Sequence, residues 1–250
     1  MQSDEFIMTK DTTLWYASWF DTPYYHILYE DRDYAEAHLF MDNLTSYLNL
    51  PENGKILDLA CGKGRHSIYL NSLGYDVTGV DLSVNSIAYA KQYENEKLHF
   101  EVHDMCRPFN DQFDAVFNLF TSFGYFDRTE DNLNTIKAIR EDLNESGFGV
   151  IDFMNSDFVI ENLVPEDVKT AGGIDFHLQR YVEDGYIIKD IRFTDKGEKF
   201  HYQERVKAKT LADFEVLFEE AGVYLLDVFG DYKLRKFHKN TSERLIMIFK

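Results

Sequence analysis

The 250-residue chain has few cysteines, few prolines and no long apolar run, and each shortage excludes a class of protein. Its two cysteines, Cys61 and Cys106, are too few for a disulfide framework and are not spaced as a zinc site, so no metal is expected. No stretch approaches the ~18 consecutive apolar residues that a membrane-spanning helix needs. An acidic, polar stretch opens the chain, MQSDEFIMTKDTT, where a secretory signal would be basic and then apolar. We therefore expect a cytoplasmic protein that makes no use of a membrane.

Positive charge is also scarce. The 26 Lys+Arg residues stand against 44 Asp+Glu, which gives a formal net charge of −18. Repulsion from phosphate backbones would oppose binding to DNA or RNA, so no nucleic-acid partner is expected. One basic cluster either meets an anionic substrate or forms a solvated loop: Lys233, Arg235, Lys236, His238 and Lys239.

Strand-like and helix-like segments alternate through the first 155 residues. This rhythm predicts an α/β fold with a doubly wound, mostly parallel sheet. Two final runs, 223–229 and 244–249, are typical of an antiparallel pair that completes the sheet. The expected strands are 55–59, 76–80, 98–102, 115–119 and 149–153, and the clearest helices are 33–48 and 130–143.

The rhythm changes after residue 154. Three strand-like runs, 176–182, 186–193 and 199–206, are separated by Glu-Asp-Gly and Asp-Lys-Gly turns. They predict an inserted antiparallel β lid. The expected division is a cofactor-binding domain of residues 1–155 and 208–250, whose N-terminal lid is 1–48, and an inserted subdomain of residues 156–207.

A glycine-rich turn follows the first strand, in the sequence ILDLACGKGRHS at 56–67. Its glycines, Gly62 and Gly64, stand where backbone N–H groups can approach a ligand closely. Asp81 lies 23 residues after Asp58, at the carboxyl end of the second strand, where a carboxylate can accept both hydroxyls of a ribose. A Gly-x-Gly pattern alone is weak, but together with two acids at strand ends it predicts an adenosine ligand.

Two residues decide between adenosine ligands. A dinucleotide fingerprint has a third glycine, and that position is Ser67. Asp58 would also face a pyrophosphate, and two anions 4 Å apart repel by ~4 kcal/mol at intermediate dielectric. S-adenosylmethionine carries an ammonium and a sulfonium at that end, so the acid would attract it. The pattern favours the methyl donor over NAD.

The chain resembles the class I S-adenosylmethionine-dependent methyltransferases. The resemblance rests on sequence motifs over residues 55–155 and on topology in the rest of the chain. The resemblance implies a Rossmann-like methyltransferase sheet and S-adenosylmethionine as cofactor. It also implies that Asp81 binds the ribose, that Asp104 holds the adenine amine, and that Met105 covers the ring. The motifs that carry it supply the expected cofactor-binding residues Asp58, Ala60, Gly62, Gly64, Asp81, Leu82, Asp104, Met105 and Asn118.

The N-terminal segment 15–26 is unusually aromatic. In methyltransferases of this type the N-terminal segment often closes over the cofactor, and aromatic faces attract a sulfonium. Tyr24, Tyr25 and Trp19 are therefore further cofactor-binding candidates. The alternative is a helix that is anchored on the core by its Trp and Phe residues. The segment 121–126, which follows the fourth strand, is a candidate lining of the acceptor pocket.

The expected function is methylation of a small-molecule acceptor at nitrogen or oxygen by in-line displacement. The inserted strands resemble those of small-molecule N-methyltransferases, including sugar-amine and glycine-type enzymes. The catalytic residue is left unknown, because methyl transfer does not demand a base and the sequence does not choose among His26, His177, His201 and Tyr125. A nicotinamide-dependent oxidoreductase and a non-catalytic cofactor-binding module remain alternatives, and a homodimer is left open.

Overall fold

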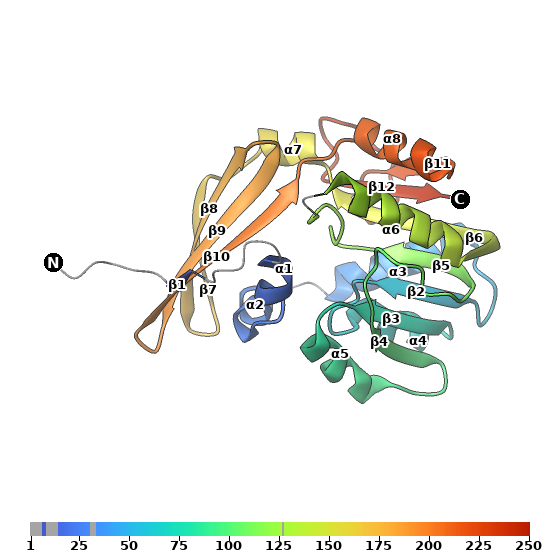
Figure 1. Cartoon of the computed structure of the whole chain (residues 1–250), viewed down its shortest axis with the longest axis horizontal. Helices are drawn as coiled ribbons and strands as arrows, with labels where there is room; N and C mark the ends of the chain where they lie inside the picture. The colour runs from blue at the N-terminus through green and yellow to red at the C-terminus, as the bar shows by residue number, and fades with distance from the viewer. Residues whose placement is uncertain (1–6, 9–14, 31–33, 127) are drawn as a thin grey trace. The chain divides into compact units, whose positions relative to one another are not determined.

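The computed structural model describes residues 7–8, 15–30, 34–126 and 128–250. The chain forms two compact units (Figure 1). One unit combines residues 1–32 with 160–208, and the other combines 33–159 with 209–250. The division of the chain into a cofactor domain and a lid subdomain, as expected from the sequence, stays a prediction.

The larger unit contains a seven-stranded sheet that is parallel except at one side. The last strand along the chain pairs antiparallel with both of its neighbours. This confirms the predicted α/β class with a mostly parallel sheet and an antiparallel final pair. In spatial order the strands are β11 (Leu225–Phe229), β12 (Arg244–Phe249), β6 (Leu143–Met154), β5 (Phe113–Asn118), β2 (Lys55–Leu59), β3 (Asp76–Asp81) and β4 (Leu98–Val102).

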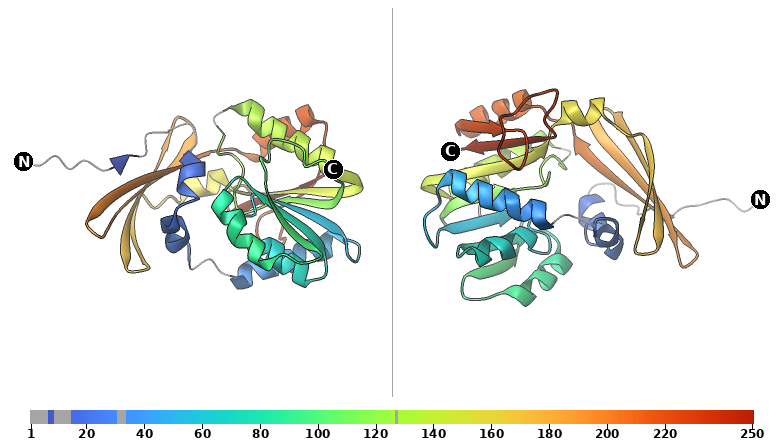
Figure 2. Two further views of the ribbon diagram at one scale, coloured as in Figure 1. Left: turned by 60° about the horizontal axis from the view of Figure 1, so that its bottom comes forward. Right: turned by 180° about the vertical axis from the view of Figure 1, so that it is seen from behind.

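Helices cover both faces of this sheet: α3 lies on one face, and α6 and α8 lie on the other (Figures 1 and 2). Local sequence sets where two of them begin. Ser83 Oγ accepts the Ser86 N–H at 2.9 Å, and Thr210 and Asp213 form a capping box. The helices of this unit are α3 (Tyr34–Leu48), α4 (Arg65–Ser72), α5 (Val84–Ala90), the 3₁₀ helix η2 (Lys91–Tyr93), α6 (Thr129–Asp142), α7 (Ser156–Glu161), which runs into the other unit, and α8 (Leu211–Ala221).

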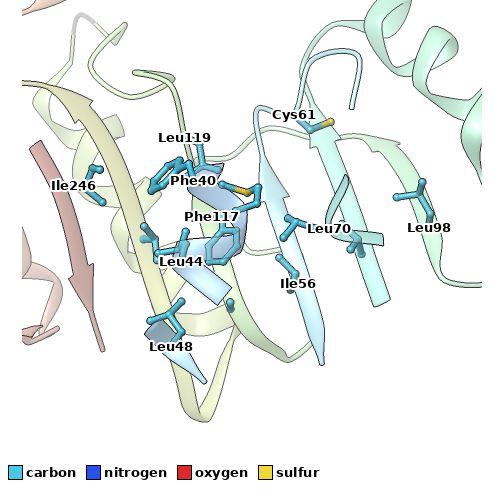
Figure 3. Packing of buried hydrophobic residues seen from close by; sticks show 14 of the residues in the cluster. Phe40, Leu44, Leu48, Ile56, Cys61, Leu70, Leu98, Phe117, Leu119 and Ile246 are labelled. Atoms are coloured by element: carbon cyan, nitrogen blue, oxygen red, sulfur yellow. The ribbon is translucent and has the colours of Figure 1, made fainter. Parts of the chain in front are cut away.

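The core on the α3 side fixes the middle of the sheet. Phe40 and Leu44 of α3 pack with Ile56 of β2 and Phe117 of β5, and all four are fully buried (Figure 3). Phe40 and Leu44 stand at i and i+4 on one face of the helix, and Ala115 and Phe117 alternate along β5 toward the same side. The strands β2 and β5 are therefore rigidly supported just before the ends that carry the candidate site.

The smaller unit is an antiparallel sheet of four strands, to which the short β1 (Ile7–Met8) adds by parallel pairing. Its two predicted hairpins are confirmed, with left-handed turn residues at Asp184-Gly185 and Lys196-Gly197. The strands are β7 (Glu166–Ala171), β8 (Ile174–Glu183), β9 (Tyr186–Asp195) and β10 (Glu198–Lys207). The sequence did not predict β7, because it is a polar edge strand whose Val168 is exposed.

Two short helices, α1 (Trp15–Trp19) and α2 (Pro23–Leu28), pack their aromatic side chains with one face of this sheet. Within the part of the chain that the structure describes, no helix is long and apolar enough to cross a membrane.

The α3 packing makes a direct prediction for stability. Replacing fully buried Phe117 by Ala should lower the free energy of unfolding by about 3–5 kcal/mol, because it removes contacts and leaves a cavity. Val84→Ala is the control, since Val84 is 64% exposed and should change the same quantity by less than about 0.5 kcal/mol. Urea denaturation followed by circular dichroism measures both, and a loss below about 1 kcal/mol for Phe117→Ala would contradict the account.

Candidate active site

The carboxyl ends of β2 and β3 lie side by side, because Leu59 pairs with Val80 in the parallel sheet. Asp81 is fixed there by backbone donors. The Gly62 N–H donates to one of its carboxylate oxygens at 2.8 Å, and the Ser83 N–H donates to the other at 2.8 Å. Two backbone donors thus fix the orientation of this carboxylate at the edge of the sheet.

The loop between β2 and α4 is built from left-handed backbone. Ala60, Gly62 and Gly64 have φ values of 59°, 57° and 81°. A Cβ on Gly64 would lie 2.6 Å from the Phe100 ring, so only glycine fits there. A Cβ on Gly62 would meet nothing within 4 Å. The loop therefore leaves open space beside the backbone at Gly62.

Asp58 is the acid that the sequence placed at this edge, and it is only 1% exposed. Burial raises its pKa to about 7, and the neighbouring charge of Asp81 adds to the rise. Ser67 Oγ donates to Asp58 Oδ2 at 2.6 Å, which opposes the rise. A cation beside this carboxyl would favour its ionised form, because opposite charges attract strongly where water is excluded. The environment of Asp58 thus suits a positively charged ligand.

Asn118 ends β5 next to Leu59, and it is fully buried. Its Nδ2 donates to the Leu59 carbonyl oxygen at 3.3 Å and lies 3.5 Å from Met105 Sδ. Its Oδ1 accepts no hydrogen bond from any residue that the structure describes. A buried acceptor without a donor is costly in a protein, and one at the edge of a sheet suits a donor that a ligand supplies.

Asp104 and Met105 follow β4. Asp104 Oδ1 accepts the Cys106 N–H at 3.0 Å, so the acid caps its own turn, and its side chain is 43% exposed. Leu82, next to the ribose acid, is 46% exposed. The edge of the sheet therefore carries an exposed carboxylate together with apolar surface, and the roles of these three residues in holding adenine stay predictions.

The structure adds residues that the sequence did not single out. Ser67, which occupies the position of the third glycine of a dinucleotide fingerprint, donates a hydrogen bond to Asp58. Arg65 lies over the ring of Phe120 at 4.5 Å from its centroid, and its Nη2 donates to His66 Nε2 at 3.3 Å. No sequence signal connects Arg65 with Phe120, because they are 55 positions apart and meet only through the pairing of β2 with β5.

The aromatic candidates near the N-terminus lie in the other compact unit. Trp19 is 1% exposed, and its indole N–H donates to Glu204 Oε1 at 2.8 Å. The Tyr24 hydroxyl donates to Asp195 Oδ2 at 3.0 Å, and the Tyr25 ring stands edge-on to Trp19. These contacts anchor the segment on the antiparallel sheet. A role for Trp19, Tyr24 and Tyr25 toward the cofactor stays a prediction.

Phe123, Cys61 and Cys106 are buried or partly buried side chains near the site. Phe123, in the segment proposed to line the acceptor pocket, is fully buried against Phe214 of α8. Burial raises the pKa of the Cys61 thiol well above its usual range and that of Cys106 to about 12. Neither cysteine is activated as a nucleophile.

Comparison with known proteins agrees with this geometry. A family model described as a methyltransferase domain matches residues 56–159. YqeM of Bacillus subtilis (strain 168), named as a methyltransferase, is 35% identical over 140 residues, which are 54% of this chain and 56% of YqeM. The matched part thus spans just over half of that relative. Glycine/sarcosine N-methyltransferase of Aphanothece halophytica is 28% identical over 76% of this chain and 67% of its own.

Solved structures show the same fold. An S-adenosylmethionine-dependent methyltransferase from Clostridium acetobutylicum superposes with a TM-score of 0.77, at 22% identity, over 91% of this chain and 95% of its own. The family model covers β2 to β6 and much of α7, the stretch that carries every candidate site residue of the larger unit. Residues 56–159 thus match a methyltransferase domain, and the chain resembles the class I S-adenosylmethionine-dependent methyltransferases in fold, as its motifs indicated.

The burial of Asp58 predicts an inverse relation between stability and pH. A carboxyl whose folded pKa is about 7, against ~3.9 when unfolded, weakens the fold progressively as pH rises from about 4 to 7. Asp58→Asn keeps the size and the Ser67 hydrogen bond but removes the charge. Its Tm at pH 8 should exceed that of the unmodified protein by ~3 °C or more, with a much smaller excess at pH 4.5.

Asp104→Asn is the matched control, because it makes the same change at a partly exposed carboxyl and should leave Tm nearly unchanged at both pH values. Differential scanning calorimetry measures the three proteins. A lower Tm for Asp58→Asn at pH 8 would contradict a buried, destabilising carboxyl.

Proposed function

We propose that the protein binds S-adenosylmethionine at the carboxyl edge of β2, β3, β4 and β5 and transfers its methyl group to a small-molecule amine. The observation that carries this proposal is the buried carboxyl of Asp58 beside the glycine loop. The orphan Oδ1 of Asn118 at the same edge supports it. A buried acid and a buried acceptor both favour a ligand end that is positively charged and rich in donors.

The other end of the ligand has its own partners. The Asp81 carboxylate, oriented by the Gly62 and Ser83 N–H groups, would accept the two ribose hydroxyls. Asp104 would accept the exocyclic amine of adenine, with Met105 and Leu82 against the ring. The open space at Gly62 lets the ligand pass close to the loop backbone.

A dinucleotide fits this arrangement poorly. A pyrophosphate beside the loop would face Asp58, and two unit charges 4 Å apart interact by ~4 kcal/mol at intermediate dielectric. That interaction is repulsive for a phosphate and attractive for an ammonium or a sulfonium. The position of Ser67 adds to the argument, since its hydroxyl serves Asp58 where a dinucleotide fold would place a glycine.

Bound S-adenosylmethionine supplies an electrophilic methyl group on a sulfonium. The residues of the chain then have one main task, which is to hold the donor and the acceptor in line. Positioning of this kind can lower a barrier by ~7–11 kcal/mol. We assign no general base, because an acceptor amine that arrives unprotonated needs none.

The acceptor class rests on the relatives. Two of them are named for small amines: the glycine/sarcosine N-methyltransferase of Aphanothece halophytica, and a Streptomyces venezuelae enzyme named for N,N-dimethylation of a dTDP-linked amino sugar. The second is 28% identical over 77% of this chain and 84% of its own. These names favour nitrogen over oxygen as the methylated atom.

The remaining parts of the proposal rest on composition. The net charge of −18 disfavours a nucleic-acid partner. The two free cysteines suit the cytoplasm, and a homodimer is compatible with the proposal but not required by it.

We also propose that the aromatic segment around Trp19, Tyr24 and Tyr25 acts as a lid over the cofactor.

Calorimetric titration with S-adenosylhomocysteine, and with NAD in parallel, tests the cofactor. We expect micromolar binding of the first and none of the second. Asp81→Ala should weaken the binding of S-adenosylhomocysteine by ~100-fold or more, because two hydrogen bonds to a charged acceptor are lost. Asp76→Ala is the matched control, since Asp76 begins the same strand at the opposite edge of the sheet and should not matter.

Binding of NAD without S-adenosylhomocysteine would overturn the proposal in favour of an oxidoreductase. Tight binding of S-adenosylhomocysteine without turnover on a broad panel of amines and alcohols would favour a non-catalytic module.

A further inference from the structure

The turn that follows β5 adopts a conformation that its residues disfavour. Phe120 and Thr121 have φ values of 59° and 62°, in the left-handed region that glycine prefers. For threonine, whose Cβ is branched, this conformation is a genuine outlier. Consecutive strained residues persist only where the surrounding structure holds them, and such strain gathers at functional sites.

An ion pair between a fully buried acid and a partly buried arginine holds this turn. Asp152 of β6 is fully buried, and its Oδ2 accepts the Phe120 N–H at 2.9 Å while its carbonyl oxygen accepts the Thr121 N–H at 2.9 Å. Arg244, at the start of β12, donates from Nε to Asp152 Oδ1 at 2.8 Å and from Nη2 to Thr121 Oγ1 at 3.0 Å. The backbone and the side chain of the turn are thus both fixed by one acid and one base.

The turn also contacts the loop between β2 and α4, through the Phe120 ring and Arg65. The Phe120 ring stacks on Tyr232 on one side, at 5.6 Å between centroids, and Arg65 lies over the same ring at 4.5 Å. Arg65 is the first residue of α4, directly after Gly64. Its guanidinium is close enough to Asp58 to lower the pKa of that carboxyl. Moving the turn would therefore move a positive charge beside the buried acid.

The location of the turn indicates which part of the ligand it serves. The ribose and adenine acids, Asp81 and Asp104, follow β3 and β4, on one side of β2. The turn follows β5, on the other side of β2, two residues after Asn118. Neighbouring strands lie ~4.8 Å apart, so the turn is about two strand spacings from the strand of the ribose acid.

We propose that Asp152 and Arg244 are a positioning pair for the amino-acid end of the bound cofactor. They keep the Phe120–Thr121 turn in its strained form, and the Phe120 ring in turn fixes Arg65 beside the loop. This inference rests on the proposed function, since it assumes that S-adenosylmethionine is the ligand. The contrasting account is that the pair only stabilises the fold.

Two ligands separate these accounts. S-adenosylhomocysteine carries the amino-acid end, and 5′-methylthioadenosine lacks it but keeps the adenosine. Arg244→Met should lower the affinity for S-adenosylhomocysteine at least tenfold in calorimetric titration. The affinity for 5′-methylthioadenosine should change less than threefold. Arg140→Met is the matched control, because it removes an arginine that bonds the Ala221 carbonyl oxygen away from the site, and both affinities should persist.

A second variant tests the strain directly. Thr121→Gly, added to Arg244→Met, makes the left-handed conformation easy without the ion pair, so it should restore S-adenosylhomocysteine affinity at least threefold. If Arg244→Met fails to fold, Thr121→Val alone removes the hydroxyl that accepts from Arg244. It should then show a smaller but equally selective loss.

Equal losses for both ligands, or no loss for either, would overturn the positioning role and leave a structural one. Failure of the unmodified protein to bind S-adenosylhomocysteine is a different result, which overturns the proposed function and this inference with it.

Discussion

The site depends on one carboxyl group that is held away from water. Asp58 projects from a strand whose neighbours on both sides are parallel and whose core contacts on the α3 side are completely buried. A charge in such surroundings needs partners, and although Ser67 supplies a hydrogen bond and Arg65 a nearby positive charge, burial still raises the pKa of Asp58 to about 7. The natural completion of this arrangement is a cation brought by the ligand. The glycine loop, the ribose acid and the Phe120–Thr121 turn are all placed around that requirement.

The parallel sheet explains why residues distant in sequence meet there. Each parallel strand delivers its carboxyl end to the same edge, so Asp58, Asp81, Asp104 and Asn118 converge without any local sequence relation. Left-handed residues other than glycine occur at that edge: Ala60 directly follows β2, and Phe120 and Thr121 lie two and three residues after β5. A site that accepts this strain gains fixed donors and acceptors before the ligand arrives.

Much of this fold follows from local sequence patterns, in which the residues that matter are close together along the chain. Alternation of strands and helices, the cap at Ser83, the capping box at Thr210 and the two glycine turns of the antiparallel sheet all rest on neighbouring residues. The resemblance to methyltransferases and the expected cofactor follow from the motif around Gly62 and Gly64 together with two strand-end acids. Strand β7 was missed because its outward side chains are polar. The Asp152–Arg244 pair was missed because the two residues are brought together only when β12 inserts beside β6.

The most direct test of the account is the number of protons released when S-adenosylmethionine binds, measured by calorimetry in two buffers of different ionisation enthalpy. A cation bound beside Asp58 lowers a pKa that is about 7 in the free protein, so binding at pH 7 should release about half a proton. Release should approach one proton at pH 6, vanish near pH 8.5, and disappear in Asp58→Asn. Binding without proton release at pH 6, or an equal release in Asp58→Asn, would contradict the role given to the buried acid.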